Sequence, residues 1–517
     1  MNKIYRVIWS KARNCYVVVS EIAKTHSKGG TGVSGIVRKA GTSVALTAAV
    51  TAMLMAPMGT AWADPIPKTD YDPATHGITV GDEVASSGEE SVAVGQKATA
   101  SGEKTVSIGG ESKATVKGAV AVGHTAEAAE RNAIAIGSDS EAHGREATAV
   151  GHDAEARLDE DSAYGNNATA SGGDSTAIGH NTLASGGSST AVGDGSHATD
   201  GSASAFGAGS AATAEDSTAL GSGSLAEEDG ANALGKKAHA SGEDSTAIGT
   251  KSEASGEDAL AIGTKSDASG ENSTAIGDEA KASAKDAFAA GTQASASSSN
   301  ATAVGAGSSA KGIDSTALGS GTIANAKRSV ALGGGEATVD EETGETSNNA
   351  AEATGVDSIA IGSGSRSSET ASIAIGGGGE GEGAVASAAG AVALGMHSSV
   401  TVENGVALGA GSVANVGAAD EPGYIPNRKS YITYDGDPVW QSTAAAVSIG
   451  DPENGMTRQI TGVAAGTNDY DAANIAQLKA AMTHYYSVNT TKETDETLNN
   501  DNDKISLDGF VCYQCNF

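Results

Sequence analysis

Apolar and polar positions alternate with a strict period through most of the chain. Glycine stands at every fourteenth position from 81 to 333, and the residue before it is usually Ile, Val or Leu. Two positions earlier lies another β-former, so both side chains share one face of a strand. The pattern predicts that these apolar residues form the core of a repeated strand. Examples are Val92, Val94, Ile134, Ile136, Ile178, Leu220, Ile248, Ile262, Ile276 and Leu318.

The position between these two apolar residues is alanine in seventeen of the nineteen repeats. Because successive side chains point to opposite faces of a strand, the second face must be crowded enough to admit only a methyl group. A strand on the surface of a globular domain would not require this. We interpret the alanine column as a surface against which other chains pack.

The second half of each unit predicts another short strand. Ala98 and Ala100 share a face, and a polar turn follows them. Two short strands and two turns in fourteen residues fit one coil of a narrow parallel β-solenoid, whereas frequent glycine would cost a helix ~1 kcal/mol per site. Coils stack at ~4.8 Å, so nineteen of them predict an all-β rod of roughly 90 Å.

The fourteen-residue frame loosens after the regular array of residues 78–333, and residues 334–457 read as irregular repeats with inserted loops. One loop concentrates aromatic residues, which are common in interaction hot spots. These are Tyr424, Tyr431, Tyr434 and Trp440. The loop is a candidate ligand contact, but the favoured interpretation is that it packs over the end of the rod and shields it from water.

Helical spacing begins beyond the loop, in residues 458–486. Asp471 is a good N-cap for a helix that starts at Ala472. The apolar residues after it follow the three-four-three spacing of a coiled-coil seam. They are Ile475, Leu478, Met482 and Tyr485.

The N-terminal 63 residues have the organisation of a signal peptide. Arg38 and Lys39 precede an apolar run of about a dozen residues, too short for the ~20 that span a bilayer. Small residues then predict cleavage between Ala63 and Asp64. Residues 64–77 would form a short lead-in to the repeats, and the mature chain would leave the cytoplasm.

Charge and composition exclude several functions. The net charge of −32 repels nucleic-acid phosphates and anionic lipid. An aromatic content of 3% leaves little for a thick globular core. Cysteines occur only at 15, 512 and 515, so no disulfide framework is expected, and the terminal Cys-x-x-Cys lacks the context of a redox or metal site.

The sequence also gives little support for a catalytic or metal site. His124, His152 and His180 each follow a frame glycine two coils apart, so they should line one edge at ~9–10 Å and cannot share a metal within a chain. A weak metal site that bridges two chains is the remaining alternative. Acidic turns such as Glu243-Asp244 are typical of a solvated face. We therefore expect no enzyme activity, no cofactor and no metal.

Two other solenoid classes fit poorly. Calcium-binding rolls need a nine-residue period with an aspartate ladder, which the sequence does not have. Ice-binding solenoids need a flat, unbroken threonine array, and Val92, Val106, Asn232 and Leu260 interrupt the threonine column.

Three motifs resemble one family. The opening MNKIYRVIW…VVVSE…AK is similar to the extended signal peptide of large autotransporters of Gram-negative bacteria, with Cys15-Tyr16 as a departure. STAIG, SVAVG and SIAIG in the fourteen-residue frame resemble the YadA-like heads of trimeric autotransporter adhesins. RQITGVAAG…DAANIAQL resembles the neck of the same family, with Gly462 in place of the usual Asn.

The resemblance implies a left-handed parallel β-roll head wound by three chains, followed by a neck and the start of a coiled coil. It implies a non-enzymatic cell-surface adhesin that binds host matrix proteins of the collagen, fibronectin or laminin class, or other bacterial cells. Attachment to the outer membrane would need an anchor that residues 487–517 do not supply, so these residues read as a truncated stalk or an aberrant C-terminus. The alternatives are a surface-layer spacer and a non-functional remnant of an adhesin.

Overall fold

The computed structural model describes residues 5–10, 15–20, 69–335, 337–339, 346–378, 382–425 and 435–481. The chain divides into two compact units, Met1–Ile66 and Pro67–Phe517. In the first unit, β1 (Tyr5–Ser10) pairs antiparallel with β2 (Cys15–Ser20). The predicted cleavage site at Ala63 and Asp64 lies outside the described residues.

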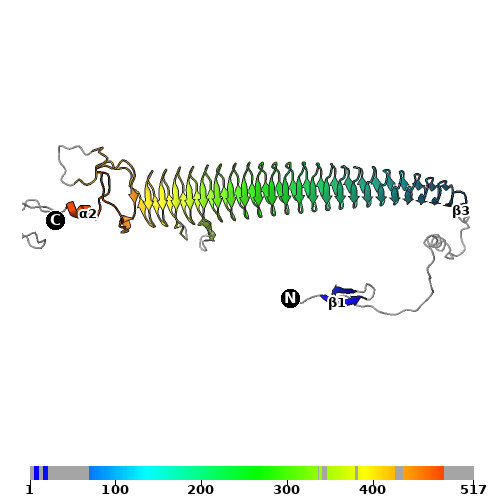
Figure 1. The fold of residues 1–517 in the computed structure, drawn as a ribbon, viewed down its shortest axis with the longest axis horizontal. Coiled ribbons are helices and arrows are strands. Elements are labelled where there is room, and N and C mark those ends of the chain that lie inside the picture. The colour runs from blue at the N-terminus through cyan, green and yellow to red at the C-terminus, as the bar shows by residue number, and fades with distance from the viewer. Residues whose placement is uncertain are drawn as a thin grey trace, which may run out of the picture. The chain divides into compact units, whose positions relative to one another are not determined.

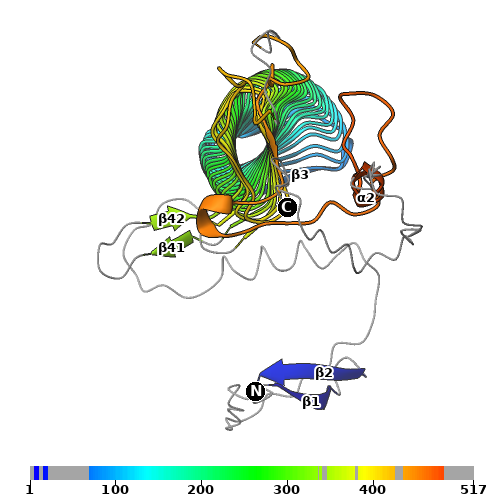
Figure 2. The same ribbon diagram turned by 90° about the vertical axis from the view of Figure 1, so that its left-hand side faces the viewer.

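The second unit contains a long parallel β-solenoid with two strands in each coil (Figures 1 and 2). β3 (Thr69–Asp72) pairs antiparallel with β4 (Gly77–Val80), where the solenoid begins. Even-numbered strands from β6 (Val92–Val94) to β40 (Val330–Leu332) form the three-residue sheet, each fourteen residues after the last. Odd-numbered strands from β5 (Ala85–Ser86) to β39 (Ile323–Ala324) form the two-residue sheet with the same step.

Both sheets continue beyond residue 333, where wider steps between paired strands alternate with steps of fourteen residues. The three-residue sheet adds β44 (Ile359–Ile361), β46 (Ile373–Ile375), β48 (Val392–Leu394) and β50 (Val406–Leu408), and ends with the shorter β52 (Val447–Ser448). The two-residue sheet adds β43 (Glu352–Ala353), β45 (Arg366–Ser367), β47 (Val385–Ala386), β49 (Ser399–Val400) and β51 (Val413–Ala414).

Insertions leave the solenoid at its turns without breaking the parallel pairing. Val330 pairs with Ile359 across an insertion that holds the hairpin of β41 (Ala337–Val339) and β42 (Thr346–Asn348). Val406 pairs with Val447 across the aromatic loop. The sheets therefore tolerate extra residues between coils, although none occurs between β4 and β40.

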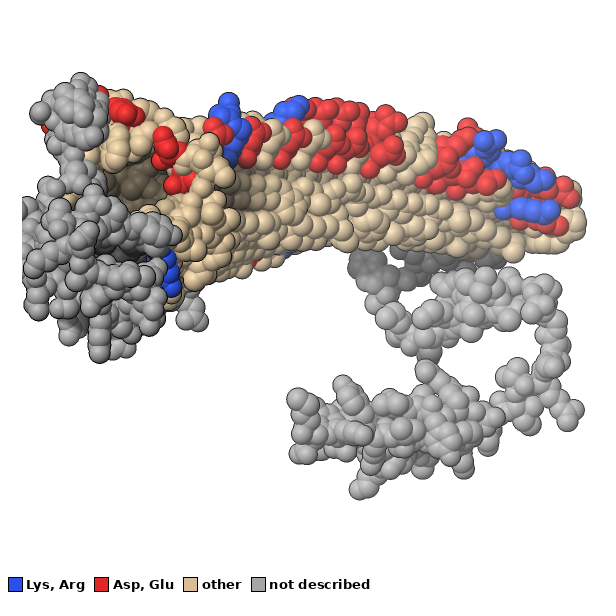
Figure 3. Space-filling view, turned by 60° about the vertical axis from the view of Figure 1, so that its left-hand side comes forward, with Lys and Arg blue, Asp and Glu red and all other residues tan. Residues whose placement is uncertain are grey.

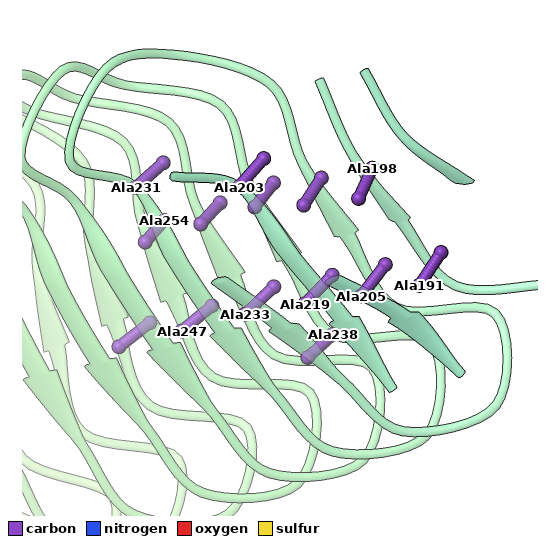
Figure 4. Packing of buried hydrophobic residues seen from close by; sticks show 14 of the residues in the cluster. Ala191, Ala198, Ala203, Ala205, Ala219, Ala231, Ala233, Ala238, Ala247 and Ala254 are labelled. Carbon is purple, nitrogen blue, oxygen red and sulfur yellow. The ribbon is translucent and has the colours of Figure 1, made fainter. Parts of the chain in front are cut away.

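The interior of each coil is lined by alanine, and this corrects the predicted core. Alanines at the centre of the three-residue strands and at the end of the two-residue strands are fully buried, as Ala247 and Ala254 illustrate (Figure 4). The two columns belong to one continuous buried cluster. The alanine column therefore fills the inside of its own chain, and the interpretation that other chains pack against it is wrong.

The residues predicted as the roll core lie on the opposite, outer face. Ile136, Ile178, Leu220, Ile248, Ile276 and Leu318 are 37–48% exposed, and Val92, Val94, Ile134 and Ile262 are half-buried. The coil is too narrow to enclose two branched side chains at one level, so the methyl groups of alanine point inward. The alternation was predicted correctly, but the inner and outer faces were exchanged.

The frame glycines stand where two coils come closest. Gly249 has φ +134°, outside the region that other residues adopt, and a Cβ there would lie 2.3 Å from the carbonyl oxygen of Gly263. The equivalent glycines meet the next coil in the same way. The period is strict because each glycine depends on the glycine one coil further on.

In many coils a serine or threonine three residues after the frame glycine secures the turn. Its buried hydroxyl donates to the carbonyl oxygen of that glycine, at 3.0 Å for Ser252 and Gly249 and at 2.8 Å for Ser224 and Gly221. The same carbonyl oxygen also accepts from the backbone N–H of that residue, at 3.2 Å for Ser224 and Gly221, so the hydroxyl adds a second bond to the turn. The sequence shows this column of Ser, Thr and Ala, but its role becomes evident only when the turn geometry is known.

A short turn lies beside the last strand at the C-terminal end of the solenoid. Here η2 (Pro452–Asn454) precedes Met456, whose backbone pairs with Asp451. The Arg458 guanidinium donates to the carbonyl oxygens of Ala410 and Ile449 and, at 2.9 Å, to Ser412 Oγ. Arg458 thus supplies donors to the last coil, where no further coil follows.

The helix of the neck segment starts later than predicted. It is α2 (Ile475–Ala481), and its N-cap is Asn474, whose Oδ1 accepts from the Gln477 backbone N–H at 2.9 Å. Gln477 Oε1 accepts from the Asn474 N–H in return, which is a capping box. Asp471 instead accepts from the backbone of Thr467 and Asn468 and closes the preceding turn.

Ile475 and Leu478 are exposed on α2, while Met482 and Tyr485 lie outside the described residues. The coiled coil and the left-handed winding therefore stay predictions. Among the residues that the structure describes, no helix combines the length and the apolar character needed to cross a membrane.

Candidate binding surfaces

The three-residue sheet presents an outward apolar column along the whole rod. Its most exposed members are large side chains, including Ile178, Phe206 and Leu220. None of the outward positions on the three-residue strands from β6 to β40 carries a charge. A continuous exposed apolar surface of this length is typical of a protein interface.

Charged side chains gather on the other parts of the coil. They occupy the outward position of the two-residue strands, as Glu253 and Lys281 do, and both turns. Figure 3 shows acidic and basic groups along one edge of the rod, beside a broad face with almost no charge. The rod is thus two-sided, with an apolar sheet and a charged remainder.

Many charges pair with the coil next to them. Lys265 Nζ lies 2.6 Å from Glu279 Oε1, and Lys117 Nζ lies 2.8 Å from Glu103 Oε2. The hydrogen bond from Lys265 lowers the pKa of the Glu279 carboxyl below its usual value. These pairs are exposed and screened by solvent, so they contribute little to stability. They add a regular pattern of alternating charge to the surface.

One shallow groove crosses this charged surface. Its volume is about 510 Å³, and basic and acidic side chains from successive coils line it, including Lys251, Lys265, Lys281, Glu253 and Asp267. The groove is open to solvent, and Ser266 and Ser295 lie among its charged residues. Its chemistry suits the docking of a polar chain better than catalysis on an enclosed substrate.

The aromatic loop projects from the last coils. The Gly423 N–H donates to the Trp440 carbonyl oxygen at 2.7 Å, and Gln441 Nε2 donates to the Ala419 carbonyl oxygen at 2.8 Å, which ties its two arms together. Tyr424 is 91% exposed and Trp440 is 37% exposed, whereas Tyr431 and Tyr434 lie outside the described residues. Tyr424 is free to meet a ligand.

One carboxylate is buried inside the solenoid. Asp161 stands where neighbouring coils have Ser or Ala and is fully buried. It accepts from the backbone N–H groups of Leu158 at 2.8 Å and Gly173 at 2.9 Å, and from Ser175 Oγ at 2.7 Å. Because these donors satisfy it, Asp161 has a structural role that sequence analysis missed.

The two-sided repeat and its glycine contacts define a class of protein, the β-solenoid heads built from fourteen-residue repeats. The chain belongs to the YadA head family of trimeric autotransporter adhesins, because the YadA head domain repeat matches more than half of its residues. The matched segments are 86–112, 117–140, 159–252, 254–280, 282–308, 310–335, 353–378 and 381–398. Residues 1–50 match the extended signal peptide of the type V secretion system. The resemblances of the signal region and of the head repeats are confirmed, and the resemblance of the neck stays a prediction.

Known proteins with similar segments carry adhesin names. Autotransporter adhesin BadA of Bartonella henselae is 44% identical over 104 residues, which are 20% of this chain and 3% of the relative. Trimeric autotransporter adhesin AtaA of Acinetobacter sp. (strain Tol 5) is 40% identical over 101 residues, again 20% of this chain and 3% of the relative. The matched stretches thus span a small fraction of these relatives.

A solved structure also matches. The collagen-binding domain of the Yersinia adhesin YadA is 23% identical, with a TM-score of 0.17, and the match covers 52% of this chain and 83% of that one.

Proposed function

We propose that this chain forms the head of a homotrimeric, non-enzymatic adhesin at the surface of a Gram-negative bacterium. The outward apolar column of the three-residue sheet carries this proposal. Burying a branched side chain contributes ~1.5–3 kcal/mol, and the column repeats such side chains along the rod. Three chains that turn these faces toward one another would cover them and leave the charged turns in contact with solvent.

The ligand-binding surface is then the charged remainder of the rod together with the aromatic loop. A trimer presents three copies of each turn at every level, so weak contacts add by avidity without a deep pocket. The ligands we propose are host matrix proteins of the collagen, fibronectin or laminin class, or other bacterial cells. Tyr424 and Trp440 would supply the aromatic contacts.

The trimer is tested by placing charge on the apolar column. Ile248→Lys with Ile276→Lys would put two lysines per chain into the interface, and we expect sedimentation to show monomers instead of trimers. Thr169→Lys with Ser295→Lys is the matched control, because other coils already have Lys113 or Lys281 at that outward position. A trimer that survives the first pair of substitutions contradicts this interface.

Adhesion is tested separately with the unmodified chain. Purified protein should bind at least one of immobilised collagen, fibronectin and laminin, or should clump bacteria that display it. Tyr424→Ala with Trp440→Ala should weaken that binding while the trimer persists. A trimer that binds none of these ligands and clumps no cells would support the spacer function instead.

A further inference from the structure

The turn that follows each frame glycine brings side chains of successive coils together. In three consecutive coils its residues are His124-Thr125, Ser138-Asp139 and His152-Asp153. The Asp139 N–H donates to the His124 carbonyl oxygen at 2.9 Å, and the Asp153 N–H donates to the Ser138 carbonyl oxygen at 3.1 Å. The backbone ladder therefore fixes these turns directly above one another.

Three of these side chains converge. Asp139, His152 and Asp153 each offer one ligand atom, and the three atoms lie within 4.8 Å of one another. His152 Nδ1 is 2.8 Å from Asp153 Oδ2. Two ligands of a tetrahedral zinc ion, each at ~2.1 Å, are ~3.4 Å apart. Small side-chain rotations would bring all three atoms onto one ion.

Asp139 is held in place by groups that leave it able to bind a cation. Thr125 Oγ1 donates to Asp139 Oδ1, and Ser138 Oγ donates to Asp139 Oδ2 at 2.8 Å. Each carboxylate oxygen keeps a lone pair beyond the one that accepts the hydroxyl. Partners of this kind orient ligands in known metal sites.

The cluster also has no basic partner. Within the described part of the chain, neither Asp139 nor Asp153 forms an ion pair with a lysine or arginine, whereas Arg145 pairs with Asp159 across adjacent coils at 2.8 Å. Two carboxylates of like charge beside one imidazole favour a bound cation that supplies the missing positive charge.

We propose that Asp139, His152 and Asp153 form a surface site for a divalent first-row transition ion, with Zn²⁺ as the test ion. Imidazole with carboxylates suits this class, whereas Ca²⁺ and Mg²⁺ prefer sites made of oxygen alone. Three protein ligands leave coordination positions for water or an external group. From the sequence, only the distances between histidines were considered as a test for a shared metal. The structure adds carboxylate ligands from two adjacent coils.

The test is calorimetric titration of ZnCl₂ into the full chain, with its cysteines alkylated beforehand so that thiols do not bind. We expect His152→Gln to remove one Zn²⁺ site per chain or to raise its Kd by at least about tenfold. Asp139→Asn should weaken the same site. His197→Gln changes an exposed histidine on a distant coil and should leave the site intact.

Circular dichroism before each titration identifies a variant that has lost its fold, and two independent variants keep the test decisive. Zn²⁺ binding with unchanged stoichiometry and Kd in both His152→Gln and Asp139→Asn would overturn the proposal. Ca²⁺ that binds this site as tightly as Zn²⁺ would overturn the role of the imidazole.

Discussion

At the residue scale, side-chain size decides which residues line the interior of the coil. Alanine fills most of both inner columns because two facing strands leave little room, with Val400 as a larger exception, and glycine occupies the point of contact between coils. Hydrophobicity alone would have placed the isoleucines inside. The narrow coil reverses that preference, so the larger apolar side chains are available for contacts between chains.

Replacing a frame glycine tests this contact. Gly249→Ala adds a Cβ at φ +134°, 2.3 Å from the Gly263 carbonyl oxygen, so we expect stability to fall by ~1–3 kcal/mol or more. Thermal unfolding followed by circular dichroism measures the loss. Gly195→Asn is the control, since a Cβ at Gly195 meets nothing within 4 Å and Asn167 and Asn181 occupy the equivalent turn position. Equal losses in both variants would contradict the steric account.

The sequence predicted the repeat, the strands and the alternation of faces, because a constant glycine step and a two-residue period are local signals. It could not predict which face is inside, since alternation alone is symmetric. It also missed the convergence of Asp139 with His152, which depends on the stacking of turns fourteen residues apart.

At the element scale, each coil is stabilised by the coils on either side, so the ends need special residues. Arg458 serves the C-terminal end by donating to two backbone carbonyl groups and to Ser412. The capping box of Asn474 and Gln477 serves the short α2 in a similar way. The helix start was mispredicted because Asp471 and Asn474 are both good N-cap residues, and only the turn around Thr467 distinguishes them.

Removing the Arg458 side chain should loosen the last coil first. Arg458→Met keeps the apolar stem but leaves the carbonyl groups of Ala410 and Ile449 without these donors. Hydrogen exchange should accelerate in the last coil, around Gly411 and Val413, and stay unchanged near Ala247. Uniform acceleration along the rod would show that Arg458 supports the whole fold rather than its end.

The insertion between β40 and β43 is bridged by an ion pair with a predictable pH dependence. Arg328 hydrogen-bonds to Asp357 and holds the pKa of that carboxyl below its ordinary value of 3.8. The pair therefore stabilises the fold above pH 3.8, and the effect disappears as the pH falls through the lowered pKa. Arg328→Met should lower the melting temperature slightly at pH 7 and by less at pH 2.

The control for this pair is Arg131→Met, because Arg131 lies in the corresponding turn, one position before the equivalent of Arg328, and forms no ion pair among the described residues. Its melting temperature should follow the wild type at both values of pH. A loss in Arg328→Met that is equally large at pH 2 would instead reflect packing of the arginine stem.

At the scale of the whole molecule, a single chain leaves a row of apolar side chains uncovered. Its core is small and continuous, and its larger apolar side chains remain outside on one sheet. Stability should therefore depend on association, and the melting temperature should rise with protein concentration. Scanning calorimetry over a hundredfold range of concentration measures this. A constant melting temperature from a monomer would show that the coil is stable alone.

The glycine-to-glycine contact also has a consequence for how such rods change over generations. Every contact that fixes a coil is made to the coil before it or after it, so duplicating the coding sequence of one repeat inserts a level without altering either end. Each duplication lengthens the rod by ~4.8 Å, and each deletion shortens it equally. Recombination between the nearly identical repeats therefore adjusts the reach of the aromatic loop in uniform steps, with no new side-chain packing to evolve.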